Sequence, residues 1–300
     1  MHEHYQPAVS SFLNYLQFEK RYSEHTISSY RNDLEQFAAY LTDQYQSPPL
    51  PEIAPVYVRS WLAELKNDKI TAKSINRKIS TLKSFFKYHL RVGSLPATPM
   101  GSVTAPKISK RLPEFVKEED MRSLFEHKEF PPGWQGRTER LLLLLFYQTG
   151  MRLSELINLK EGQVDFARRS LKILGKGNKE RVVPAGEELC RQLEDYRQAK
   201  RRELETFDAT YLFVLENGRQ LNRTYVYKAV KKHLSEVTTL NKRSPHILRH
   251  TFATHLTNNG ADLNAVKELL GHSSLASTQV YTHNSIEKLK EAHKKAHPKA

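Results

Sequence analysis

The sequence has little cysteine and no long apolar segment. Cys190 is its one cysteine, which excludes an internal disulfide and a cysteine-only metal cluster and agrees with a reducing compartment. The longest apolar run, residues 141–147, is far shorter than the roughly 18 residues of a membrane-spanning candidate. The first residues, MHEHYQPAVSSF, lack the basic-then-apolar pattern of a signal peptide. We therefore expect a cytoplasmic protein without membrane insertion.

Acidic residues are scarce relative to basic ones. The 300 residues include 47 lysines and arginines but only 33 aspartates and glutamates, which gives a formal charge of +14. A field of this sign attracts polyanions, which are nucleic acids, anionic membranes or acidic proteins. The apolar fraction of 39% still suffices for packed cores, and the length suggests about two domains.

Residues 71–92 are predicted to form an amphipathic helix with an unusual polar face. Its apolar face comprises Ile75, Ile79, Leu82, Phe86 and Leu90. Its polar face comprises Lys73, Arg77, Ser80, Ser84, Lys87 and Arg91. A plain solvated face usually mixes charges of both signs, whereas this face would repel itself unless phosphates neutralise it. We therefore predict nucleic-acid contacts by Lys73, Arg77, Lys87 and Arg91, a plain solvated face being the alternative.

Helical periodicity ends between residues 95 and 113, where four prolines and three lysines or arginines occur. This composition predicts a basic, extended linker. The linker would separate a helical N-terminal domain, residues 1–94, from a larger C-terminal domain, residues 114–300.

The C-terminal domain is predicted to be mostly helical with a small β-hairpin. Alternating residues at 171–173 and 182–183 flank the glycine-rich turn GKGNK, a pattern typical of two paired strands. At most one further strand is expected, near YLFVL at residues 211–215. The predicted fold class is therefore mainly α: a helical N-terminal domain plus a mixed α/β, mostly helical C-terminal domain.

The C-terminal domain also contains residues able to act on a phosphate: Arg152, Lys176, His246, Arg249, His272 and Tyr281. Arg152 follows Gly150 at a predicted helix start, and Lys176 lies in the predicted hairpin turn. His246 and Arg249 are three residues apart, so they share one face of a helix. That helix should begin with Ser244 as N-cap and Pro245 at its first position.

Each residue type suits one step of phosphodiester cleavage by a tyrosine. Two arginines can hold the non-bridging oxygens through bidentate hydrogen bonds as negative charge accumulates. A tyrosine hydroxyl, with an ordinary pKa of about 10, needs a proton acceptor or an electropositive pocket. A lysine can protonate the leaving 5′ oxygen, and a histidine can accept a proton or bind the phosphate. We expect no metal and no cofactor, because these cations already supply the positive charge.

Four motifs, TGMRLSEL, LGKGNKERVVP, HILRHTFATHL and LLGHSSLASTQVYTH, together closely resemble the tyrosine recombinase (phage integrase) family, in particular its Xer-type bacterial members. SEHTISSYRNDLEQF and SINRKISTLKSFFKYHL resemble that family's SAM-like core-binding domain. The resemblance implies that Arg152 binds the scissile phosphate, that Lys176 is the general acid and that Tyr281 is the nucleophile. It assigns His246, Arg249 and His272 to the same catalytic site.

The resemblance also implies the reaction and its setting. Tyr281 would form a 3′-phosphotyrosyl link and release a 5′-hydroxyl, so that strands are cleaved and rejoined without ATP. A C-terminal tail, residues 284–300, would dock on a neighbouring protomer in a homo- or hetero-tetramer on a double-stranded recombination site. The compact layout favours chromosome-dimer resolution, and hence chromosome partition at cell division, by a protein associated with the nucleoid.

Other interpretations remain open at this point. The chain could integrate a mobile element, relax DNA as a type IB-like topoisomerase does, or bind DNA without catalysis. His246, His250 and His255 include a spacing used by zinc helices, but the intervening residues contain no carboxylate. We expect His250 and His255 to be structural.

Overall fold

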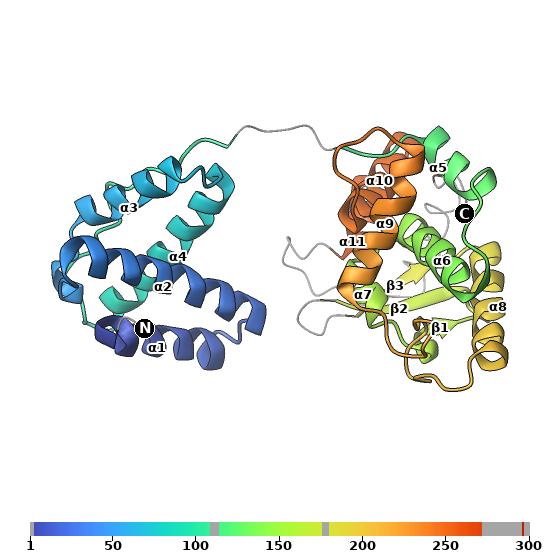
Figure 1. Cartoon of the computed structure of the whole chain (residues 1–300), viewed down its shortest axis with the longest axis horizontal. Helices are drawn as coiled ribbons and strands as arrows, with labels where there is room; N and C mark the ends of the chain where they lie inside the picture. The colour runs from blue at the N-terminus through green and yellow to red at the C-terminus, as the bar shows by residue number, and fades with distance from the viewer. Residues whose placement is uncertain (1–2, 109–113, 176–179, 272–295, 297–300) are drawn as a thin grey trace. The chain divides into compact units, whose positions relative to one another are not determined.

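The computed structural model describes residues 3–108, 114–175, 180–271 and 296. The chain divides into two compact units, residues 1–111 and 112–300, which are seen in Figure 1. Within the described ranges, no helix is long and apolar enough to cross a membrane. The predicted fold class is confirmed: the chain is mainly helical, with one small sheet in the second unit.

The first unit is a bundle of helices around one apolar core. The helices are α1 (Gln6–Asn14), a π-helix (Tyr15–Glu19), α2 (Glu24–Tyr45), α3 (Pro55–Asn67) and α4 (Ala72–Arg91). Two of them begin at hydroxyl N-caps: Ser23 Oγ accepts from the Thr26 amide, and Thr71 Oγ1 accepts from the Ser74 amide. Such caps satisfy backbone donors that the first helical turn leaves unpaired.

The buried stripe of α4 largely follows the predicted pattern. Ile75, Ile79, Leu82 and Phe86 are buried. Leu90 was expected among them but is 40% exposed, and the stripe ends at buried His89 instead. The buried face of α4 also includes Lys78, Thr81 and Phe85. At 3.6 residues per turn, the centre of this wider face lies close to His89 and far from Leu90.

The first part of the expected linker, residues 95–113, packs on the first unit and is not a free extended segment. Leu95, Met100 and Val103 are buried in the core of the first unit. The side-chain amide of Asn76 donates to the Pro106 carbonyl at 3.0 Å. Apolar residues between the prolines therefore anchor the first part of this segment to the helices.

The second unit contains the remaining helices and the sheet. Its helices are α5 (Glu118–Glu126), α6 (Gly133–Thr149), α7 (Leu153–Ile157), α8 (Glu187–Glu203), α9 (Arg223–Val237), α10 (Pro245–Asn258) and α11 (Leu263–Leu270). Its strands are β1 (Val164–Asp165), β2 (Ser170–Leu174) and β3 (Glu180–Pro184). The apolar run 141–147 lies in α6, which packs against α8, α9 and α10 (Figure 1).

The sheet is antiparallel, in the order β1-β2-β3. The predicted β2–β3 hairpin is confirmed, with Leu171 opposite Val183 and Ile173 opposite Arg181. The two-residue strand β1 was not predicted, because it is too short to show alternation. Residues 211–215 form no strand; they make isolated bridges, Lys160 with Tyr211 and Val214 with Gln220.

Candidate active site

A glycine turn at the end of α6 places Arg152. Gly150 adopts φ +58°, a left-handed conformation that favours glycine. A Cβ built on Gly150 would lie 2.4 Å from Cδ1 of Phe252. The turn therefore also requires a residue without a side chain, because a methyl group would collide with the Phe252 ring. The backbone then extends to Arg152, which is the N-cap residue of α7.

Arg249, from α10, ties this turn to the end of α11. Its Nη1 donates to the Gly150 carbonyl and its Nη2 to the Leu270 carbonyl, each at 2.6 Å. Only 8% of Arg249 is exposed. Burial, followed by the nearby charge of Arg152, lowers the pKa of Arg249 to about 10. The guanidinium therefore stays charged at neutral pH.

Three arginines converge on the C-terminal turn of α11. Arg181 Nε donates to the Leu269 carbonyl at 2.9 Å, Arg249 Nη2 donates to the next carbonyl, and Arg152 Nη2 donates to the Gly271 carbonyl at 3.2 Å. The last carbonyls of a helix lack intrahelical partners and form the negative end of its dipole. The end of α11 therefore holds cationic side chains from α10, β3 and the start of α7 close together.

Glu155 lies between two of these arginines. Its Oε1 accepts from Arg152 Nη1 at 2.8 Å and from Arg181 Nη1 at 2.7 Å. Its Oε2 accepts from the Arg152 amide at 2.6 Å and from Arg181 Nη2 at 2.8 Å. Burial alone would raise the pKa of Glu155, but hydrogen bonds and charge from Arg181, and then from Arg152, hold it below its usual value. The carboxylate is therefore ionised and fully engaged.

Arg181 was not singled out from the sequence. The sequence offers one indication, which is the register of the predicted hairpin. Arg181 lies opposite Ile173, so the two side chains share a face of the sheet, and both are buried. An arginine on the inward face of a strand requires a partner of opposite charge. The sequence pattern does not show that this partner is Glu155, 26 residues earlier.

His246 lies in the first turn of α10, three residues before Arg249. Its side chain is exposed, yet its pKa is lowered by partial desolvation and then by electrostatic interaction with His250, Arg249 and Arg152. We therefore expect a neutral imidazole at pH 7, able to accept a proton. The predicted helix start is confirmed, since Ser244 is the N-cap residue and Pro245 the first residue, although the Ser244 side chain makes no capping hydrogen bond.

The structure thus brings together Arg152, His246 and Arg249. Lys176, His272, Tyr281 and most of the expected tail lie outside the described residues. Residues 175 and 180 border the segment with Lys176, and Gly271 directly precedes His272.

In the first unit, the residues of α4 predicted to contact nucleic acid, Lys73, Arg77, Lys87 and Arg91, are exposed. Lys78 on the same helix is instead buried and pairs with Asp33. The exposed residues differ in their partners. Arg77 pairs with buried Asp33 and donates to Ser29 Oγ at 2.8 Å. The Arg91 guanidinium lies over the Tyr15 ring at 4.3 Å. Lys73 and Lys87 are exposed on the same helix.

The expectation that His255 is structural is confirmed. Its Nδ1 lies 3.0 Å from the Tyr147 hydroxyl and its Nε2 lies 2.9 Å from the Val116 carbonyl. Because a carbonyl only accepts, Nε2 carries the proton and Nδ1 accepts from tyrosine. Both ring nitrogens are thus occupied in hydrogen bonds, unlike those of a metal ligand. His250 is exposed.

The stability of the second unit should fall as the pH drops below about 6.5, the ordinary pKa of histidine. Burial lowers the pKa of His255 in the folded protein, so the unfolded chain takes up a proton first and gains stability. We expect His255→Gln to be less stable at pH 7.5 but to lose less stability on going to pH 5.5. Denaturant unfolding followed by Trp134 fluorescence in a Trp61→Phe background measures this, and equal pH losses would contradict it.

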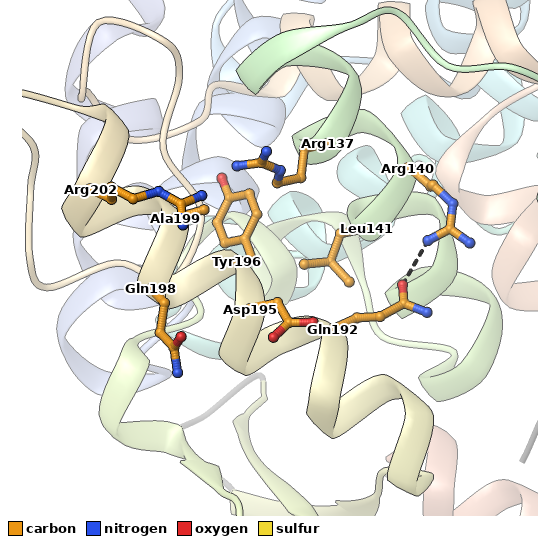
Figure 2. Close-up of a pocket in the computed structure, with 9 residues that line it drawn as sticks. All are labelled: Arg137, Arg140, Leu141, Gln192, Asp195, Tyr196, Gln198, Ala199 and Arg202. Atoms are coloured by element: carbon orange, nitrogen blue, oxygen red, sulfur yellow. Dashed lines mark hydrogen bonds between the residues drawn. The ribbon is translucent and has the colours of Figure 1, made fainter.

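A hollow of about 370 Å³ is lined by residues of α6 and α8, and none of the arginines bonded to the end of α11 lines it (Figure 2). Arg137, Arg140 and Arg202 line it. Arg140 donates to Gln192, while Arg137 and Arg202 both pair with Glu203. The residues that line the hollow include no histidine and none of the residues predicted to act on a phosphate, so the hollow is a weaker candidate than the end of α11.

Comparisons with known proteins cover nearly the whole chain. The model of the phage integrase family matches residues 114–288, and that of the phage integrase N-terminal SAM-like domain matches residues 9–93. A tyrosine recombinase XerC of Oceanobacillus iheyensis is 40% identical, over 97% of this chain and 96% of that protein. A XerC of Chlorobaculum parvum is 38% identical, over 97% and 94%. The XerH recombinase in a post-cleavage complex with its palindromic difH substrate is 25% identical, with a TM-score of 0.70 over 96% of this chain and 88% of that one.

Proposed function

Since the chain belongs to the phage integrase family, we propose that it is a site-specific DNA recombinase that cuts and rejoins strands through a phosphotyrosine. The observation that carries this proposal is the pair of arginines, Arg152 and Arg249, held on neighbouring carbonyls at the end of α11. Two fixed guanidiniums suit a phosphate that gains negative charge during attack. His246 adds a neutral imidazole beside them.

The reaction follows from the chemistry of these groups. The Tyr281 oxygen attacks phosphorus, loses its proton to a neighbouring base such as His246, and forms a 3′-phosphotyrosyl bond. The bond from phosphorus to the 5′ oxygen breaks, and Lys176 gives that oxygen its proton. Arg152, Arg249 and His272 stabilise the charge on the other oxygens. A 5′-hydroxyl from a second duplex reverses the step, so the energy of the broken bond is retained.

The decisive test is trapping of the covalent intermediate. Nicked duplexes carrying candidate recombination sites are incubated with the protein, with and without a metal chelator, and analysed on denaturing gels. We expect a protein–DNA adduct with the wild type in both conditions and none with Tyr281→Phe. An adduct formed by Tyr281→Phe, or one that disappears on chelation, would exclude this mechanism.

Two basic helix faces are suited to hold the duplex. On α4 the exposed cations include Lys73 and Lys87. On α9 the exposed residues include Arg223, Thr224, Tyr227, Lys228, Lys231 and Lys232, and Arg223 contributes to the positive field at His246. Phosphate neutralisation by such residues supplies most sequence-independent affinity. We therefore propose that residues 1–94 act as a DNA clamp, that residues 95–113 link it to residues 114–300, and that the latter form the catalytic domain.

The contribution of α4 predicts a change in salt dependence. In Lys73→Gln/Lys87→Gln, the slope of log affinity against log salt should become shallower by about 2, because each lost phosphate contact removes about 0.9. Arg191→Gln/Arg202→Gln, which removes two exposed charges from α8, is the matched control and should keep the slope. Binding titrations at several salt concentrations measure both, and an unchanged slope in the lysine variant would exclude these contacts.

The biological setting is proposed from the relatives. The relatives described above are XerC and XerH recombinases, and on this basis we propose resolution of chromosome dimers in the cytoplasm, on the nucleoid, rather than integration of a mobile element. We further propose a tetramer on DNA, of this chain alone or with a paralogue, joined through residues 284–300. Recombination between two sites would require the tetramer. Relaxation of supercoiled DNA by a single protein molecule would instead indicate topoisomerase activity.

A further inference from the structure

The arrangement of charges around Glu155 is asymmetric. Glu155 and Arg181 have side chains only 4% and 5% exposed, whereas the Arg152 side chain is 32% exposed. Arg181 places one Nη on each carboxylate oxygen. Arg152 places a single Nη on Oε1 and its backbone amide on Oε2. The buried ion pair is thus Glu155 with Arg181, and Arg152 adds a more exposed charge at its edge.

We propose that Arg181 is a positioning residue which keeps the Arg152 charge available to the scissile phosphate. This inference rests on the proposed function. Arg181 neutralises Glu155 through two hydrogen bonds. Without Arg181, the negative charge of Glu155 would be balanced by Arg152 alone. A carboxylate and a phosphate bind a guanidinium through the same fork of donors, so an unbalanced Glu155 would compete directly with the substrate.

Arg181 has a second contact that supports this role. Its Nε donates to the Leu269 carbonyl, and a Cβ on Gly271 would lie 3.0 Å from its Cδ. Arg181 therefore packs against the same α11 turn whose final carbonyls accept from Arg249 and Arg152. One side chain of β3 fixes both the counterion of Arg152 and the backbone to which Arg152 is bonded.

Loss of Arg181 would change the net charge of the cluster. Arg152, Arg181, Arg249 and Glu155 together carry a net charge of +2, that is, three positive charges and one negative charge. Removing Arg181 lowers this to +1 and leaves a buried carboxylate without its bidentate partner. Removing the Glu155 charge as well restores +2. Loss of Arg181 should therefore be repaired in part by neutralising Glu155.

The test measures the rate of adduct formation at saturating protein, separately from affinity for the nicked duplex. For Arg181→Met we expect a rate about 10²-fold lower, the order expected when a reacting group is misplaced, with affinity unchanged within about twofold. Arg181→Lys, which keeps the charge, should lie between this variant and the wild type. Arg191→Met, a change at an exposed position of α8, should form the adduct at the wild-type rate.

The double variant Glu155→Gln/Arg181→Met separates positioning from simple destabilisation. We expect it to cleave about tenfold faster than Arg181→Met, because coupled residues are not additive. Both rates are normalised to the folded fraction, because neutralising Glu155 also removes the cost of an unpaired buried carboxylate. If Arg181 served the fold alone, the folded fraction of Arg181→Met would cleave at the wild-type rate. A double variant no faster than Arg181→Met, or an Arg181→Met variant as fast as the wild type, would overturn the proposal.

A second readout needs no cleavage. In NMR spectra, inorganic phosphate should shift the Arg152 side-chain Nε–H signal in the wild type and in the double variant, and should shift it much less in Arg181→Met. Equal shifts in all three proteins would overturn the positioning role. If the wild type shows the phosphate shift but forms no adduct on any duplex, the proposed recombinase function fails while the role of Arg181 stands.

Discussion

Arg249→Lys is expected to slow adduct formation by about 10²- to 10³-fold, the cost of losing one electrostatic contact to a transition state. The Arg249 guanidinium bonds the Gly150 and Leu270 carbonyls together, and a guanidinium has further N–H donors for a phosphate. An ammonium is a point charge and cannot reproduce this planar fork. The same nicked-duplex assay, run as single-turnover kinetics, measures the effect.

The control is a conservative change at an exposed arginine. Arg202→Lys lies on α8, outside the cluster, and should cleave at the wild-type rate. Duplex affinity of Arg249→Lys should change much less than its rate, since the positive charge is retained. A rate within about threefold of the wild type, well below the cost of a lost oxyanion contact, would show that Arg249 does not hold the phosphate.

Gly150→Ala should destabilise the second unit by about 2–4 kcal/mol, from the cost of a left-handed residue and of overpacking. The new methyl group would meet the Phe252 ring at 2.4 Å and Leu270 Cδ2 at 3.0 Å. Relief of this clash must move α10 or α11, and both of these helices contribute to the arginine cluster. We therefore expect slower cleavage as well, measured on the folded fraction.

Gly260→Ala is the matched control for backbone strain alone. Gly260 also has a positive φ, +84°, but a Cβ there would meet nothing within 4 Å. Its cost should therefore be about 1–2 kcal/mol, with normal cleavage by the folded protein. Unfolding followed by Trp134 fluorescence compares the two variants, and equal losses of stability would show that the Phe252 contact relaxes freely.

Much of the fold could be predicted from the sequence because helical periodicity is local. The stripe from Ile75 to Phe86 and the β2–β3 hairpin are of this kind. The arginine motif at Arg152 and the HxxR spacing at Arg249 also marked two residues that the structure brings near each other. These signals depend on neighbours within a few residues, so a single sequence contains them.

The remainder depends on contacts between distant segments. The burial of Met100 in the first unit and the pairing of Arg181 with Glu155 are set by packing, which periodicity does not report. The strand β1 has two residues and no period of its own. Arg181 was overlooked because it directly follows the lysine-containing turn GKGNK, and the sequence does not show that its side chain is buried.

Guanidinium groups and backbone carbonyls are hydrogen-bonded at the end of α11, so folding itself assembles part of the proposed catalytic centre. Buried Arg249 and Arg181 lose their rotational freedom when the domain folds, and long side chains lose up to about 2 kcal/mol in this way. That entropic cost is then absent when DNA binds. The enzyme consequently meets its substrate with preorganised donors, and less of the binding free energy is lost in ordering side chains.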